Sequence, residues 1–240
     1  MSISVLSLRA LERPSWRVLR VSGAALLVLL AWEAVGADRS VSAWFADPVQ
    51  GFAWRDHPSL VKVFHEGGRM LAGLALAGLL VDAFLLRDAD LPSRARRAAT
   101  LALIVSCMVL VSLFKRGSLS SCPWDVIDFG GTVPYVPHWP WLLADGGPGH
   151  CFPSGHASAA FAFFPLYFLW RPYAARVATK ILAAILCFGT VFGATQVVRG
   201  AHYVSHVAWT AWICWTISAV ALSRYDVVHR RRHHGRSPDI

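Results

Sequence analysis

Three short stretches of the sequence carry side chains that could bind and transfer a phosphoryl group. They are Lys115-Arg116, Pro153-Ser154-Gly155-His156, and the segment from Arg199 to His206. A Ser-Gly pair at the start of a helix presents unpaired backbone N–H groups at the positive end of the helix dipole, and these suit a phosphate oxygen. Lysine adds a point charge, and arginine adds a fork that matches phosphate geometry.

The histidines in these stretches could carry the chemistry. Histidine titrates near neutral pH, so one imidazole can attack phosphorus while another protonates the departing oxygen. The candidates for these catalytic roles are His156, His202 and His206. The residues predicted to bind the phosphate are Lys115, Arg116, Ser154, Gly155 and Arg199.

The elements that must position these residues are predicted to be membrane helices. Hydrophobic residues make up 55% of the 240-residue chain, charged residues only 15%, and mean hydropathy is +0.47. A spanning helix needs about 20 mostly apolar residues. Six windows approach this, at about 18–36, 70–86, 98–114, 156–171, 179–198 and 203–223. We predict an all-α, six-helix transmembrane bundle forming a single domain over residues 1–240, with its core at about 70–220.

The distribution of basic residues predicts the orientation of this bundle. Most of the 23 lysines and arginines fall on one side if the six helices alternate. They are Arg9, Arg13, Arg17, Arg20, Arg87, Arg94, Arg96, Arg97, Arg171, Arg176, Lys180, Arg224, Arg230, Arg231, Arg232 and Arg236. The positive-inside rule makes that side cytoplasmic. Both termini and the basic tail at 224–240 would then be cytoplasmic, and the active site would face the periplasm.

The net charge of +9 does not indicate nucleic acid, because the basic residues are spread over short segments between apolar runs. An anionic membrane is the simpler partner. Residues 37–69 are expected to form an interfacial loop, with a short surface helix starting near Ser59. The first window also resembles a signal peptide, with small residues at 35–37 where cleavage could occur.

The five cysteines show no metal-finger spacing. Cys107, Cys187 and Cys214 lie in apolar runs and are expected to be small core residues. Cys122 and Cys151 lie at opposite ends of one polar loop, and a disulfide would form between them if that loop faces an oxidising compartment. The sequence alone leaves this pairing open.

Together, the three stretches resemble the motifs of the type 2 phosphatidic acid phosphatase superfamily, which are Lys-x6-Arg-Pro, Pro-Ser-Gly-His and Ser-Arg-x5-His-x3-Asp. Here they read Lys115-x6-Cys122-Pro123, Pro153–His156, and Thr195-Gln196-x5-His202-x3-His206. The resemblance implies a phosphohistidine on His202, protonation by His156, and phosphate held by Lys115, Ser154 and Gly155, with no cofactor or metal. A weaker similarity to bacterial lipid A and envelope-lipid phosphatases implies the inner membrane as location.

Three departures from the family pattern affect the predicted site. Cys122 and Gln196 replace arginines, and His206 replaces the aspartate that orients the nucleophile. Arg199 lies about one helical turn after Gln196 and could reach the same pocket; Arg116 could similarly offset the loss at 122. His206 supplies no negative charge, so either another acid such as Asp125 assists or the activity is weakened.

Three other functions remain open. A phosphotransferase would use the same phosphohistidine with a lipid acceptor instead of water. A zinc hydrolase could use His202 and His206, four residues apart, with His150 and His156, although no glutamate accompanies the pair. A catalytically inactive membrane protein of the same fold is the third. The sequence does not choose among phospholipid, isoprenoid and lipid A phosphates as substrates.

Overall fold

The computed structural model describes residues 16–84, 92–138 and 143–234, with side chains between residues 18 and 222 of these ranges. Most of this part of the chain is helical. The long helices are α2 (Trp16–Ala34), α4 (Gly67–Phe84), α5 (Arg94–Gly117), α8 (Ala175–Val198) and α9 (Val204–His234). The shorter elements are α3 (Ala37–Ala43), β1 (Ala46–Asp47), β2 (Gly51–Phe52), the π-helix η1 (Ser59–Glu66), the 3₁₀ turns η2 (Pro123–Asp125) and η3 (Ile127–Phe129), α6 (Ser158–Phe161) and α7 (Phe164–Trp170).

The apolar runs of the sequence become helices long enough to cross a membrane. Four qualify by length and composition, namely Ser59–Phe84, Arg94–Gly117, Ala175–Val198 and Val204–Leu222. The helices α2 and α3, which meet at an angle of 67°, together form a fifth candidate. A chain with this many apolar helices is a multi-pass membrane protein.

The window at 156–171 folds differently from the others. It forms α6 and α7, which together make one shorter apolar helix from Ser158 to Trp170. This is less than the roughly 17–25 residues that a straight span requires. Pro165 in the first turn of α7 lacks an N–H, which suits the start of a new helical segment. Six membrane crossings therefore remain a prediction.

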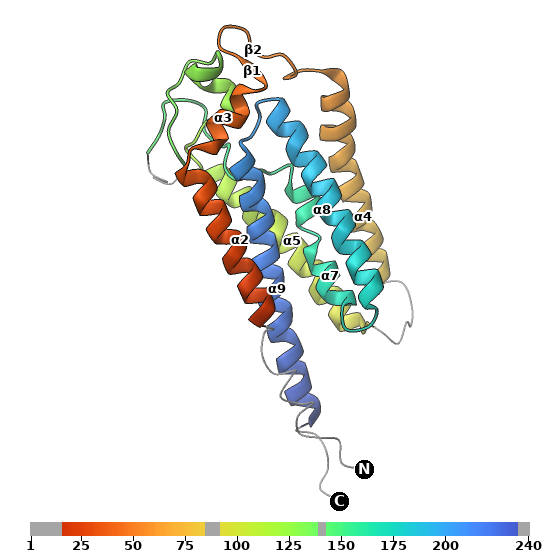
Figure 1. The fold of residues 1–240 in the computed structure, drawn as a ribbon. Helices are drawn as coiled ribbons and strands as arrows, with labels where there is room; N and C mark the ends of the chain where they lie inside the picture. The colour runs from red at the N-terminus through yellow and green to blue at the C-terminus, as the bar shows by residue number, and fades with distance from the viewer. Residues whose placement is uncertain (1–15, 85–91, 139–142, 235–240) are drawn as a thin grey trace, which may run out of the picture.

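The short pair α6–α7 lies at the centre of the bundle. Its side chains Phe161 and Phe164 join Ile104 and Cys107 of α5 and Cys214 of α9 in the largest buried apolar cluster. In Figure 1, α2 lies alongside α9, and the connecting loops with β1, β2 and α3 gather at one end of the helices, while α4 packs mainly against α5. The residues predicted to carry the chemistry belong to that end.

The opposite end of the bundle holds the described basic residues at the start of α5 and around the α7–α8 connection, namely Arg94, Arg96, Arg97, Arg171, Arg176 and Lys180. Arg97 lies 3.6 Å from Asp82, and Arg96 donates to the Phe168 carbonyl. Arg9, Arg13 and Arg87, and the part of the predicted tail at 235–240, lie outside the described residues. The backbone of 224–234 continues α9 as helix.

The surface helix expected from Ser59 is not a separate element. Residues 59–66 form the π-helix η1, which continues directly into α4 as one helix from Ser59 to Phe84. No proline interrupts the junction, and Gly68 allows α4 to approach Phe192 of α8, because a Cβ there would lie 3.1 Å from the Phe192 ring. The apolar run that the sequence showed from residue 70 is therefore extended towards the loops.

The close approach of α8 to α6 predicts that Gly189 cannot be enlarged. A Cβ at Gly189 would lie 2.2 Å from the Phe161 ring. We expect Gly189→Ala to lower stability by about 1–3 kcal/mol through overpacking, measured by thermal unfolding in mild detergent. The control is Gly78→Ala on α4, where nothing lies within 4 Å of the new Cβ. If both variants behave alike, the α8–α6 packing described here is wrong.

Candidate functional site

The Pro153–His156 segment is fastened to the beginning of α9. The Ser154 N–H donates to the His206 carbonyl at 3.1 Å, and the Thr210 hydroxyl donates to the Ser154 carbonyl at 2.9 Å. The Ser154 hydroxyl accepts from the Ala157 N–H at 3.4 Å. These bonds fix the turn before α6 against the helix that follows His202.

A disulfide secures the other side of this segment. Cys122 and Cys151 are bonded, with their Cα atoms 5.1 Å apart, so the pairing left open by the sequence is formed. Within the same loop, Asp145 accepts hydrogen bonds from the Ser121 N–H and hydroxyl and from the Gly147 N–H. The long connection between α5 and α6 is thus held closely over the helix ends.

His202 lies in the tight connection between α8 and α9. Gly200 has a φ of 73°, a left-handed conformation that favours glycine. A Cβ on Gly200 would also lie 2.4 Å from the Phe52 ring. The N–H groups of Ala201 and His202 both donate to the Gln196 carbonyl. The turn therefore places the His202 ring in a buried position beneath the loops.

Lys115 lies beside the predicted phosphate-binding turn, and its charge acts on both His156 and His202. A Cβ on Gly155 would lie 3.3 Å from Lys115 Cδ, so the lysine side chain passes directly beside this glycine. Burial lowers the pKa of His202 well below its usual value, and the charges of Lys115, His206 and His156 lower it further. His202 is therefore neutral at physiological pH, which is the form that can act as a nucleophile.

His156 is also neutral at physiological pH. Burial, the adjacent His65 and the charges of Lys115 and Arg69 lower the pKa of His156 to about 3. Its Nε2 atom is buried and has no hydrogen-bond partner among the described residues. An unpaired ring nitrogen beside Lys115 and Gly155 is free to bond to a ligand that enters the site.

His65 is a member of the site that the sequence analysis missed. Its ring stacks on that of His156, with ring centroids 3.6 Å apart and planes inclined by 26°. His65 lies in η1, far from the recognised motifs in sequence, and only the amphipathic pattern of residues 59–64 drew attention to this region. A histidine at the end of such a segment gives no sequence signal for stacking against another histidine.

Arg199 contacts Gln196, the residue that stands in place of the family arginine. Its Nη1 donates to the Gln196 side-chain oxygen at 3.2 Å and lies 3.4 Å from His65 Nδ1. Its Nε donates to the Arg55 carbonyl at 2.7 Å. The guanidinium of Arg199 thus contacts His65, whose ring stacks on that of His156.

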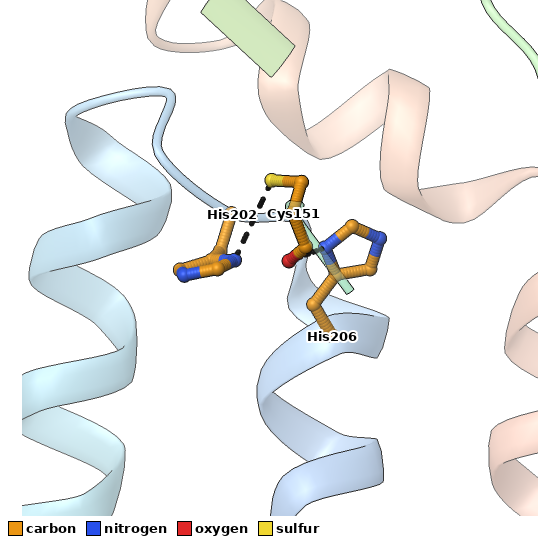
Figure 2. Close-up of side chains that lie close together, drawn as sticks. All are labelled: Cys151, His202 and His206. Carbon is orange, nitrogen blue, oxygen red and sulfur yellow. Dashed lines mark hydrogen bonds between the residues drawn. The ribbon is translucent and has the colours of Figure 1, made fainter. Parts of the chain in front are cut away.

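Cys151 lies between His202 and His206, as Figure 2 shows. His202 Nδ1 lies 3.6 Å from Cys151 Sγ, and His206 Nδ1 lies 3.1 Å from the Cys151 carbonyl oxygen, to which it donates. The two imidazoles meet edge to face, with centroids 5.9 Å apart. His202 Nε2 is on the side of the ring away from Cys151. The outward nitrogen is therefore the one available to a substrate.

Comparison with known protein families gives a match. The family model for the PAP2 superfamily matches residues 97–230, more than half of the chain. The chain belongs to the PAP2 superfamily. No curated protein and no solved structure matches it. Members of the PAP2 superfamily are phosphatases, so membership indicates phosphatase activity on a phosphate substrate.

Three residues considered from the sequence do not join the histidines among the described contacts. Arg116, in the last turn of α5, is exposed. The Asp125 carboxylate accepts from the Cys122 N–H at 3.2 Å, and burial raises the pKa of this acid. His150 is exposed at the loop surface. As a PAP2 member the chain thus keeps Lys115, Ser154, Gly155, His156 and His202 together, while Arg116 points elsewhere.

The donor set does not fit a zinc ion. One ligand atom each from Cys151, His202 and His206 lie within 4.8 Å of one another. The Cys151 sulfur, however, is bonded to Cys122 and cannot be a thiolate ligand. His206 Nδ1 is bonded to a backbone carbonyl, and His150 is exposed. The residues of this PAP2 site therefore suit phosphoryl transfer better than metal binding.

The disulfide predicts a strong dependence of stability on Cys122. It closes a connection with a sequence separation of 29 residues, and its removal should cost about 3 kcal/mol. We expect Cys122→Ser to lower the Tm markedly and also to reduce activity, because Cys151 contacts both His202 and His206. The control is Cys187→Ser, which changes an exposed free cysteine. Equal Tm values for the two variants would contradict the structural role of the bond.

Proposed function

We propose that this protein is a metal-independent lipid phosphatase of a bacterial inner membrane. It crosses the membrane six times with both termini in the cytoplasm, and its site faces the periplasm. The Cys122–Cys151 bond supports this orientation, because disulfides persist in oxidising compartments. The basic residues at the other end of the helices support it independently. The apolar helices around the site favour a substrate that reaches it from the lipid bilayer.

The observation that carries this proposal is the convergence of Lys115, the Ser154-Gly155 turn, His156 and His202 at one end of the bundle. Lys115 contacts the Gly155 position and its charge acts on both histidines. A phosphate entering beside Lys115 would lie between two neutral imidazoles. Arg199 supports this pocket from behind through Gln196 and His65. Arg116, being exposed, would at most attract the anionic headgroup towards the site.

The proposed reaction has two steps. His202 Nε2 attacks phosphorus and forms a P–N bond as the P–O bond to the lipid breaks, and His156 passes to the departing oxygen a proton that arrives with the substrate. Water then attacks the phosphohistidine, with His156 accepting its proton, and inorganic phosphate leaves. Lys115 and the backbone N–H groups near Gly155 stabilise the charge on the phosphoryl oxygens. His206 is proposed to position His202 indirectly, because its ring donates to the carbonyl of Cys151, whose sulfur contacts His202 Nδ1.

This mechanism predicts that His202 is indispensable. Phosphate release is measured from a panel of phospholipid, isoprenoid and lipid A phosphates in detergent. We expect release from at least one lipid, its abolition in His202→Ala, and a fall of about 10²–10⁴-fold in His156→Ala. Vanadate should inhibit, because it mimics five-coordinate phosphorus. No turnover on any member of the panel, or turnover that survives in His202→Ala, would indicate an inactive protein or another mechanism.

The low pKa of His156 predicts an acidic pH dependence. With a pKa of about 3, the His156 ring is neutral at pH 5–8 and has no acidic proton to give, so the proton that it passes to the leaving oxygen must arrive with the substrate. A phosphate monoester has a second ionisation near pH 6 and carries that proton only below it. We expect kcat/KM to fall about tenfold per pH unit above roughly pH 6. A flat profile to pH 8 would contradict this proton source.

A further inference from the structure

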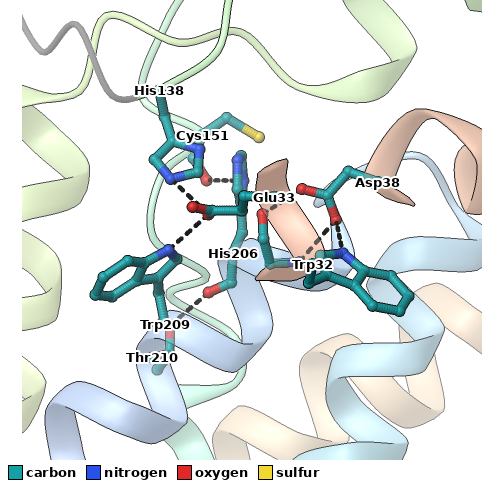
Figure 3. Close-up of polar contacts among 9 residues, drawn as sticks. Trp32, Glu33, Asp38, His138, Cys151, His206, Trp209 and Thr210 are labelled. Atoms are coloured by element: carbon teal, nitrogen blue, oxygen red, sulfur yellow. Dashed lines mark hydrogen bonds and ion pairs between the residues drawn. The ribbon is translucent and has the colours of Figure 1, made fainter. Parts of the chain in front are cut away.

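A buried carboxylate from the N-terminal helix lies behind the histidines of the site. Glu33, in the last turn of α2, lies 2.9 Å from His138 Nε2 through its Oε1 atom, and both side chains are less than a tenth exposed. The Trp209 indole N–H donates to the same oxygen at 2.7 Å. Figure 3 shows Glu33 between His138 and Trp209, next to His206. The Glu33 carboxyl group thus accepts one hydrogen bond from Trp209 and lies within ion-pair distance of the His138 ring.

This carboxylate is costly for a structural anchor. Its second oxygen, Oε2, is buried and has no hydrogen-bond partner among the described residues. Burying a charge with unsatisfied lone pairs opposes folding. A glutamine or a serine could join α2 to Trp209 without that cost. A buried negative charge at this position is therefore better explained by an effect on the neighbouring histidines of the site than by a structural role.

A continuous series of contacts leads from Glu33 to the proposed nucleophile. The His138 ring meets that of His206 edge to face at 5.5 Å and stacks on Phe152 at 4.1 Å. His206 then donates to the Cys151 carbonyl, and Cys151 Sγ contacts His202 Nδ1. Every side chain in the series is buried or nearly so. The weak dielectric screening of such a region strengthens the effect of a charge.

We propose that Glu33, acting through His138 and His206, supplies the negative charge behind His202 that the family pattern obtains from an aspartate at the position of His206. This inference rests on the proposed function. Glu33 lies outside the family-matched residues 97–230, so it is a feature of this chain and not of the motif. Glu33 and His138 are positioning residues, since neither touches the substrate.

The need for the charge follows from the first chemical step. When His202 Nε2 bonds to phosphorus and the lipid oxygen departs with the proton from His156, the His202 ring keeps its Nδ1 proton and becomes cationic. An imidazole at position 206 carries no negative charge to offset that of His202. The Glu33 carboxylate offsets it through space, with no proton leaving His202 and none added to Glu33. Its benefit therefore arises in the transition state and should appear in kcat.

The first test compares Glu33→Gln with the native protein on the best lipid phosphate of the panel. Glutamine keeps an oxygen for the Trp209 N–H and removes only the charge. We expect kcat to fall roughly 10- to 100-fold with KM little changed, and Glu33→Asp to recover part of the loss. The matched control is Trp209→Phe, which removes a donor to the same carboxylate but keeps the charge, and it should retain most of the activity.

The second test moves the acid back to its family position. In a His206→Asp background the nucleophile has an acid directly behind it, so Glu33→Gln should then have almost no effect on kcat. A purely structural Glu33 would instead cost the same factor in both backgrounds, since independent effects add in free energy. If His206→Asp does not fold, the comparison of Glu33→Gln, Glu33→Asp and Trp209→Phe decides alone.

The outcomes separate this inference from the proposed function. Native activity that is lost in His202→Ala but unchanged in Glu33→Gln overturns only the role of Glu33. Equal losses of kcat in Glu33→Gln and Trp209→Phe, with a matching fall in Tm, also overturn this role. They would show that Glu33 only holds α2 against Trp209. An inactive native protein, indistinguishable from His202→Ala, contradicts the proposed function itself.

Discussion

The site depends on the attachment of the Cys151 segment to the start of α9. The segment is bonded to Cys122 on one side and hydrogen-bonded to His206 and Thr210 on the other. Because of this attachment, a turn from one long loop and a histidine from another both lie near Lys115. A buried imidazole has few alternatives to the position that its neighbours impose, so the same contacts that build the fold also keep the histidines neutral.

Much of the arrangement could be predicted from the sequence because its signals are local. An apolar run of spanning length forms a helix largely because of its own composition. Four such runs form helices long enough to cross a membrane, and the bent pair α2–α3 gives a fifth candidate. The residues of the motifs Lys115, Pro153–His156 and His202 are near one another because the ends of successive antiparallel helices meet. The family match over 97–230 confirms the recognition made from those motifs.

The remaining features depend on packing between segments distant in sequence. His65 stacks on His156, and Glu33 approaches His138, only because η1 and α2 lie against the loop end of the bundle. Nothing in the spacing of these residues indicates such pairs. His206 could be expected to face His202 from its four-residue spacing, but its hydrogen bond to the Cys151 carbonyl depends on how the loop folds back. The window at 156–171 likewise forms a helix shorter than the apolar run suggests, and the side chains of this helix are buried among the longer helices.

The proposed mechanism requires a covalent bond between phosphorus and one ring nitrogen of His202. The most direct measurement is acid-free quenching of the protein with a labelled lipid phosphate after a few milliseconds, followed by peptide mapping by mass spectrometry. The account predicts a phosphoryl group on His202 that is stable in alkali and absent when this histidine is alanine. Label on any other residue, or full turnover with no trapped phosphoprotein at any time, would contradict it.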